Sequence, residues 1–503
     1  MPKSFAFRHL ASLLCMALIV LASTGCSDEV AGDDCADDEQ YNPAAESCVP
    51  IEDNRTLNND PNDQNNQSNQ NNQSNQNNDD NPCANQSPTR LSGTVTIPSG
   101  ELPLPDVAVY VPYGDTVEDI ETGASCVRCE DELSAQAMAE TTTDVHGQFV
   151  LEDVPAADEV PLIVETGKWR RQATVTDVQL CEDNTVDEEK TRLPRNTDEG
   201  DLPQIAVTTG SWDALECLVR KIGVSDSEFT TDDDDGRVHL FAGGPDSEGV
   251  YGTDRFDDSL NDGAQFTDAT NWWGDLDNLL DYDMILHSCE GTGNTGDKTG
   301  GPRDALLDFT EHGGRVFLSH WHQVWLDGGP DYFDDVADWG GLDMSAPGGM
   351  DGVATGYILD NFPKGQMLFD WMYHTGTEPA GEFDIQDVRG SISSLNDDIA
   401  QEWIWIENED DFFDDFFPSD GQEEFTQYFS FNTPANVPED DQCGRVVFSD
   451  IHVSAQDQSS QDDPFPTGCT SSITPQEKAL IFMLFDLSSC IIADDKKGGP
   501  LQD

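Results

Sequence analysis

Two patterns of apolar and polar residues divide the chain beyond residue 90. Between residues 91 and 165, apolar and polar residues alternate over short runs that Pro and Gly separate. Period-two alternation between closely spaced turns is typical of an all-β sandwich. The sequence predicts strands at residues 91–97, 107–111, 148–154 and 162–165.

From residue 204 onward, continuous apolar runs alternate with longer stretches in which apolar residues recur every three or four positions. This pattern predicts buried strands and amphipathic helices in a doubly wound, flavodoxin-like α/β fold, with a mostly parallel sheet covered on both faces. We expect strands at residues 204–208, 237–241, 282–287, 315–319, 428–431 and 445–449. We expect helices at residues 211–222, capped by Ser211, and at 271–280, 303–312 and 475 onward. The last helix opens with Thr474-Pro475-Gln476-Glu477, a capping box with Pro in its first turn.

The N-terminus has the features of an export signal. Lys3 and Arg8 precede an apolar run at residues 10–22 that is too short to span a bilayer, and small residues follow it. The stretch Leu21-Ala-Ser-Thr-Gly-Cys26 resembles a bacterial lipobox, which implies lipidation of Cys26 after cleavage. The alternative is plain secretion. We expect an exported protein that is lipid-anchored in the cell envelope, at the outer membrane.

Composition refines the domain organisation. The segments expected in chain order are a signal peptide (1–25), an acidic Cys-containing segment (26–57), an Asn/Gln-rich disordered tether (58–89), the β-sandwich (90–181), an acidic linker (182–202), the α/β domain (203–492) and a disordered tail (493–503).

The chain holds 24 Lys and Arg against 100 Asp and Glu, a net charge of −76. This balance argues against nucleic-acid binding, which needs clustered cations. Without a polybasic patch, membrane attachment would rest on the acyl chains alone.

Several motifs of the first domain resemble the carboxypeptidase regulatory-like fold. They are Ser92-Gly-Thr-Val-Thr, Thr143-Asp-Val-His-Gly-Gln-Phe-Val and Leu151-Glu-Asp-Val-Pro, with a long Cys-containing insertion at residues 113–141. The resemblance implies a spacer or binding platform without catalysis.

The second domain resembles the class I glutamine amidotransferase-like fold, especially its ThuA-like branch. The motifs are Tyr282-Asp-Met-Ile-Leu, Arg315-Val-Phe-Leu-Ser-His and Gly444-Arg-Val-Val-Phe-Ser-Asp-Ile-His, with insertions expected at residues 243–268, 327–358 and 385–425. True amidotransferases place a nucleophilic Cys just after the strand that here ends at Ser319, and His320 stands there instead. Amidotransferase activity is therefore not expected. The two domains together resemble a lineage of uncharacterised bacterial lipoproteins.

Export makes disulfides available. Thirteen cysteines, less Cys15 in the signal and Cys26 at the anchor, leave an odd number. In the fold that the second domain resembles, the first and last helices often pack together, which would allow a Cys217–Cys490 bond. Cys443 and Cys469 bracket the late strand, and Cys289 would then remain free. The pair Cys126 and Cys129 has redox or zinc spacing but lacks both a second close pair and a strand-helix context.

Candidate site residues gather at the expected carboxyl ends of the strands, where open α/β sheets bind ligands. They are Cys289, Glu290, His320, Trp321, His322, Asp450 and His452. The three histidines, with Glu290 or Asp450, could bind a divalent metal ion. The same histidines and Trp321 could instead line a sugar-type pocket or make structural hydrogen bonds. Cys289 could act as a nucleophile with His320 as its base, or it could be an inert buried thiol.

Three functions follow from these alternatives. The first is an envelope lipoprotein whose sandwich presents an α/β domain that binds a small polar ligand, such as a carbohydrate. The second is a metal-dependent or Cys-dependent hydrolase at the carboxyl edge of the sheet. The third is an adhesive or structural surface protein.

Overall fold

The structure is a computed structural model. It describes residues 39–42, 47–50, 83, 87–114, 117–129, 133–340, 353–407, 424–453, 460, 462–470 and 472–496. The chain divides into two compact units, residues 1–78 and 79–503. The described part of the first unit is an antiparallel hairpin of β1 (Glu39–Asn42) and β2 (Ser47–Pro50). The signal, Cys26 and most of the tether lie outside the described residues. Among the helices that the structure describes, none is both long enough and apolar enough to traverse a membrane.

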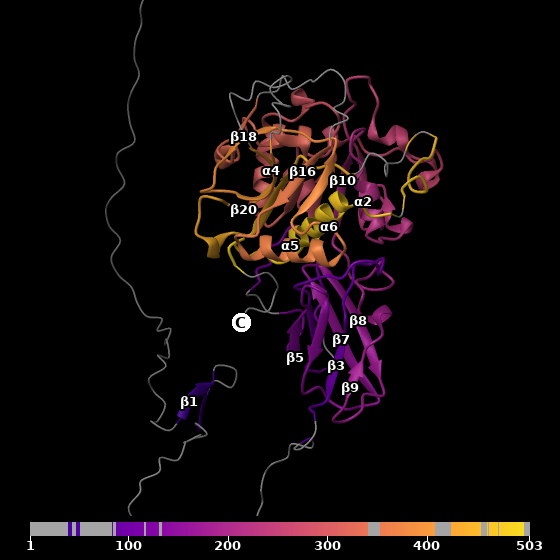
Figure 1. The fold of residues 1–503 in the computed structure, drawn as a ribbon, viewed down its shortest axis with the longest axis vertical. Helices are drawn as coiled ribbons and strands as arrows, with labels where there is room; N and C mark the ends of the chain where they lie inside the picture. Colours follow the sequence, from indigo (N-terminus) through magenta and orange to yellow (C-terminus); the bar gives the residue numbers. More distant parts are fainter. Residues whose placement is uncertain are drawn as a thin grey trace, which may run out of the picture. The chain divides into compact units, whose positions relative to one another are not determined.

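The second unit begins with the predicted β-sandwich (Figure 1). One sheet has the order β6–β3–β9 and the other the order β5–β4–β7–β8. The strands are β3 (Arg90–Thr94), β4 (Ala108–Pro112), β5 (Ala137–Thr142), β6 (Gln148–Leu151), β7 (Glu159–Thr166), β8 (Trp169–Thr176) and β9 (Asp183–Thr185). Their inward residues, including Leu91, Val109 and Leu162, form an apolar core between the sheets.

The segment expected to be an acidic linker belongs to the sandwich. Its first residues form β9, which pairs with β3, and a short helix α1 (Glu188–Thr191) follows. Val186 and Leu193 are buried in the core. These apolar residues anchor the segment although acidic residues surround them.

The α/β domain is built on a ten-stranded sheet with the order β11-β12-β10-β13-β14-β21-β20-β19-β16-β17 (Figure 1). The first six strands of that order pair in parallel, and the last four are antiparallel to their neighbours. The parallel strands are β10 (Ile205–Thr209), β11 (Phe229–Thr230), β12 (Val238–Ala242), β13 (Met284–His287), β14 (Arg315–Ser319) and β21 (Gly444–Ser449). The antiparallel strands are β16 (Val353–Ile358), β17 (Glu382–Gln386), β19 (Gln401–Glu407) and β20 (Glu424–Thr433). A separate two-stranded sheet joins β15 (Ala337–Trp339) to β18 (Ile392–Leu395).

Helices cover both faces of the large sheet, as predicted. The helices α2 (Leu215–Lys221), α5 (Pro363–His374) and α6 (Pro475–Ser488) pack on the face that carries Val207, Leu286 and Phe317. The helices α3 (Leu276–Leu279) and α4 (Gly301–Glu311) pack on the face that carries Ala206, Ile285 and Val316. Successive strand residues point to opposite faces, so a continuous apolar strand fills both cores.

Other sequence predictions also differ from the structure in detail. The helix expected at residues 271–280 is only the short α3 at Leu276–Leu279, preceded by the 3-10 turn η4 at Ala269–Asn271. The expected insertions contain or border β16, β17 and β19, which extend the main sheet. The helix expected from Ser211 begins at Leu215, and no side chain caps it. The expected disordered tail is fixed at least at Asp494, whose carboxylate forms a 2.6 Å ion pair with Arg445.

Four disulfides join eight of the described cysteines. Cys83–Cys181 lies within the sandwich and Cys217–Cys469 within the α/β domain. Cys126–Cys443 and Cys129–Cys490 connect the insertion of the sandwich to the α/β domain. The predicted Cys217–Cys490 pair is therefore wrong, because the insertion reaches the end of α6 and pairs there with Ile491.

The unpaired thiol is Cys289, as predicted, and it is the free cysteine among the described residues. Cys126 and Cys129 each bond to a distant partner, which excludes a local redox pair or zinc site. Four disulfides indicate an extracytoplasmic protein.

Candidate metal-binding site

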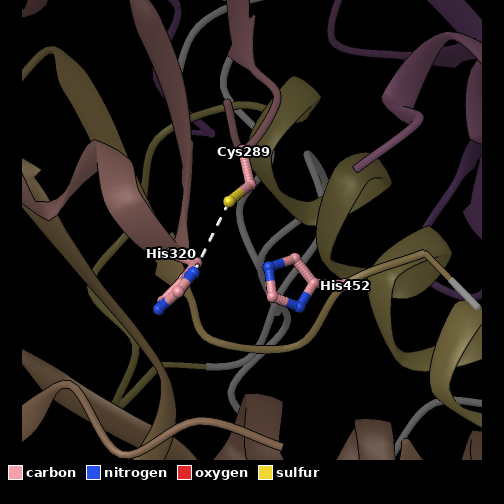
Figure 2. A group of neighbouring side chains, drawn as sticks. All are labelled: Cys289, His320 and His452. Atoms are coloured by element: carbon pink, nitrogen blue, oxygen red, sulfur yellow. Dashed lines mark hydrogen bonds between the residues drawn. The ribbon is translucent and has the colours of Figure 1, made fainter. Parts of the chain in front are cut away.

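Cys289, His320 and His452 meet at the carboxyl ends of the neighbouring strands β13, β14 and β21 (Figure 2). One potential ligand atom from each side chain lies within 4.8 Å of the other two. The Sγ atom of Cys289 is 3.5 Å from Nδ1 of His320. The rings of His320 and His452 are nearly perpendicular, with their centroids 5.2 Å apart. Figure 2 shows one ring nitrogen of His452 turned toward the other two residues.

The sharp end of β14 places His320 in this group. His320 has a φ of +40°, in the left-handed region that residues with a Cβ atom rarely adopt. The chain therefore leaves the strand at Ser319 and enters the 3-10 helix η6 (His320–Trp325) at once. In a longer strand, His320 and His322 would lie on the same face. The strand ends before both residues, so they point in different directions.

Asp213, which sequence reasoning missed, connects the two histidine-bearing turns. One carboxylate oxygen accepts a 2.5 Å hydrogen bond from Oγ of Ser319, the residue before His320. The other accepts a 2.9 Å hydrogen bond from the backbone N–H of Val453, the residue after His452. Asp213 follows β10 at the same edge of the sheet, so the strand-end rule could have identified it.

Burial keeps the three clustered side chains neutral. It raises the pKa of the Cys289 thiol to about 12, although backbone N–H groups of Trp321 and Gly291 oppose the rise. It lowers the pKa of His320 well below the usual value, and that of His452 to about 3. At neutral pH the site therefore holds a thiol and two neutral imidazoles. Neutral imidazole is the form that binds metal ions, and metal binding displaces the thiol proton.

The cluster has the ligand types and spacing of a zinc-class site. On a tetrahedron, a sulfur about 2.3 Å and a nitrogen about 2.0–2.1 Å from zinc lie about 3.6 Å apart. The Cys289–His320 separation of 3.5 Å matches that value. In addition, Nε2 of the buried His452 has no hydrogen-bond partner in the structure. These residues fit a metal ion with one thiolate and two imidazole ligands.

His322 is held in a separate hydrogen-bond network. Its Nδ1 accepts a 2.9 Å hydrogen bond from Nε1 of Trp325. The proton must therefore be on Nε2, which lies 2.9 Å from the carbonyl oxygen of Ser288 and donates to it. The ring also stacks on His287, with centroids 4.9 Å apart. Both nitrogens are occupied, so His322 is not placed as a ligand.

Glu290 lies three residues beyond the end of β13, and its carboxylate is bound by groups outside the cluster. Its carboxylate accepts hydrogen bonds from Lys298 (2.5 Å), Asn294 (2.8 Å) and the backbone of Gly244 (2.8 Å).

Asp450 is likewise engaged. Its two oxygens accept hydrogen bonds from the backbone N–H and the hydroxyl of Ser391, at 2.9 and 2.8 Å. Trp321 is partly exposed, and its ring centroid is 5.1 Å from that of His320. The structure therefore brings together Cys289, His320 and His452, with Trp321 beside them, and gives the other candidate residues protein partners.

Comparisons with known proteins reveal only remote likenesses. No protein-family model matches the sequence, and neither does any curated protein. Among solved structures, a ThuA-like protein from Bacteroides uniformis ATCC 8492 is similar with a TM-score of 0.29 and 11% identity, covering 59% of this chain and 93% of that one. A type II cohesin–X-dockerin complex from Acetivibrio cellulolyticus is similar with a TM-score of 0.14 and 14% identity, covering 29% of this chain and 78% of the other. Both TM-scores are below 0.5, so we draw nothing about function from either likeness.

Proposed function

We propose that this is an exported protein whose α/β domain binds a small polar ligand at the carboxyl edge of the sheet, through a zinc-class metal ion held by Cys289, His320 and His452. The observation that carries the proposal is the convergence of one thiol and two neutral imidazoles within 4.8 Å. Lipidation of Cys26 would anchor the protein to the cell envelope, and the sandwich would serve as a spacer.

A metal ion with three protein ligands keeps one coordination position open for water or another small molecule. Structural zinc sites usually have four protein ligands, whereas zinc sites that bind water or substrate have three. His320 retains a small exposed surface of 6%, and the adjacent Trp321 is partly exposed. A ligand would therefore approach the ion on the side of His320 and Trp321.

Part-exposed indole rings favour a ligand with an apolar face, such as a carbohydrate. Trp212 is 44% exposed, and its backbone N–H donates a 3.1 Å hydrogen bond to the carbonyl of Cys289. The backbone of Trp212 thus adjoins that of Cys289, and the ring of Trp321 lies beside that of His320. Sites for small molecules combine such aromatic side chains with a few placed polar groups.

Metal-dependent hydrolysis is the second candidate function, and the open position favours it. A metal ion there would lower the pKa of a bound water toward 7. Hydrolysis with Cys289 as the nucleophile is disfavoured, because a thiol with a pKa of about 12 forms almost no thiolate at neutral pH.

Metal analysis of the purified chain tests the proposal. The protein is dialysed against zinc, and the metal retained per chain is measured for wild type, His320→Ala and His452→Ala. His312→Ala is the matched control, because His312 is exposed at the end of α4. Retention of one equivalent by wild type and the control, and its loss in both site variants, would support the proposal. No retained zinc in wild type would refute it.

A further inference from the structure

Arg389 lies in the loop between β17 and β18, and two sets of hydrogen bonds fasten this loop to the strand end that carries His452. On one side, Gln476 accepts a 2.9 Å hydrogen bond from the backbone of Gln386 and donates a 2.8 Å bond to the carbonyl of His452. On the other side, Ser391 binds Asp450, two residues before His452. The loop that carries Arg389 is therefore held against the segment that carries His452.

The guanidinium group of Arg389 has no acidic partner within the described part of the chain. Its one side-chain hydrogen bond joins Nη1 to the carbonyl of Val388, at 3.0 Å. Its own carbonyl is fixed by a 2.6 Å hydrogen bond from Gln427. Asp450 is near, but both of its oxygens are bound by Ser391. Most of the five guanidinium donors thus remain available.

An unpaired cation is unexpected in a protein with a net charge of −76. Arg192 and Arg445 form close ion pairs. Arg303 and Arg315 form none among the described residues, but each donates several hydrogen bonds to carbonyl groups. The charge of Arg389 also acts on the cluster, since it helps to lower the pKa of His320 and His452 and opposes the rise in the pKa of Cys289. The guanidinium is also partly exposed, so a dissolved anion can reach it.

We propose that Arg389 binds an oxyanion, so that the ligand of this site carries a carboxylate or phosphate group. Guanidinium binds both groups through paired, charge-assisted hydrogen bonds. The same anion could reach the open position of a metal ion held by Cys289, His320 and His452. This inference rests on the ligand site proposed above and specifies the chemical class of the ligand.

Isothermal titration with small anions tests the inference. Acetate and phosphate represent the two anion classes, and acetamide is the neutral match for acetate. We expect acetate or phosphate to bind wild-type protein and acetamide not to bind. In Arg389→Gln the affinity for that anion should fall about tenfold or more, because a charge-assisted pair is lost. Arg389→Lys keeps the charge but loses the paired donors of the guanidinium. Its affinity for the anion should lie between those of wild type and Arg389→Gln.

The control is Arg220→Gln, since Arg220 lies on α2 and pairs with Asp226. This variant should bind as wild type does. The inference is overturned if acetamide binds as well as the anions, if neither anion binds wild type, or if Arg389→Gln keeps the wild-type affinity. Unchanged thermal unfolding would show that Arg389→Gln is folded.

Titrations of metal-free and zinc-loaded protein separate this inference from the proposed function. Failure of wild type to take up zinc refutes the metal site, whereas anion binding that depends on Arg389 in the metal-free protein still supports the anion site. Anion binding that is equal in wild type and Arg389→Gln refutes the anion site, whether or not zinc binds.

Discussion

The carboxylate of Asp213 accepts a 2.5 Å hydrogen bond from the hydroxyl of Ser319, directly before His320. Because the same carboxylate also binds the backbone of Val453, it determines how far apart His320 and His452 lie. Asp213 would not contact the proposed ion, but it positions His320 and His452, two of the three residues that would bind the ion.

Asp213→Ala should therefore weaken zinc binding by about 10-fold to 100-fold, the usual effect of removing a group that orients metal ligands. Ser319→Ala removes one of the two connections and should have a smaller effect. Competition with a chelator measures both affinities. Glu216→Gln, on the adjacent helix α2, is the control and should leave the affinity unchanged. Equal affinities in wild type and Asp213→Ala would contradict this role.

Glu216 should make stability depend on pH. Its side chain is buried, one oxygen lacks a partner, and burial raises its pKa from 4.5 to about 8. The charge of Asp213 contributes to this rise, and Arg255 opposes it. Below pH 4.5 Glu216 is protonated in both the folded and the unfolded protein, and its burial costs no ionisation energy. Between pH 4.5 and 8 only the unfolded protein releases this proton, so the free energy of unfolding falls as the pH rises.

Glu216→Gln cannot ionise and should escape that loss. Relative to wild type, its free energy of unfolding should rise between pH 4.5 and 8, by on the order of a few kcal/mol. Urea unfolding at several pH values measures the difference. A difference that stays constant with pH would show that Glu216 is not protonated in the folded protein.

The buried pair of Lys298 and Glu290 should support the fold rather than the metal site. Both side chains are about 1% exposed, and Lys298 also lies 5.3 Å from the ring centroid of Trp273. Lys298→Met leaves a buried carboxylate without its cation and should destabilise the protein by about 3–5 kcal/mol. The double variant Lys298→Met/Glu290→Leu should recover part of that loss. If the folded double variant failed to bind zinc, Glu290 would belong to the metal site after all.

Alkylation of the denatured, unreduced chain should label Cys289 and none of the eight cysteines in the four described disulfides. Peptide mapping by mass spectrometry identifies the labelled residue. In the native protein, labelling of Cys289 should be slow, because the thiol is buried and protonated. Label on Cys217 or Cys490 in the denatured chain would contradict the pairing described above.

The elements predicted best from sequence are those with strong local signals. The continuous apolar runs at β14 and β21 mark both strands within one residue, and the capping box at Thr474 marks the start of α6. Because parallel strands end at one edge, the sequence also indicated where Cys289, His320 and His452 would lie.

Other features depend on contacts between distant residues. The disulfides of Cys126 and Cys129 require the sandwich insertion to reach the α/β domain, which no local pattern reveals. The backbone of His320 enters the left-handed region, so the strand does not reach His322, whose ring binds Trp325 instead. The loop that carries Arg389 likewise reaches His452 through contacts between distant residues, which no local pattern reveals.

Cobalt binding tests the central claim most directly, because Co²⁺ reports its own ligands. Titration of metal-free protein should give about one equivalent of tetrahedral cobalt, with strong visible absorption and a near-ultraviolet thiolate-to-cobalt charge-transfer band. The charge-transfer band should be absent in Cys289→Ser, while His320→Ala and His452→Ala should weaken or abolish binding. A wild-type spectrum equal to that of hydrated cobalt, or a charge-transfer band that survives in Cys289→Ser, would contradict a metal site formed by Cys289, His320 and His452.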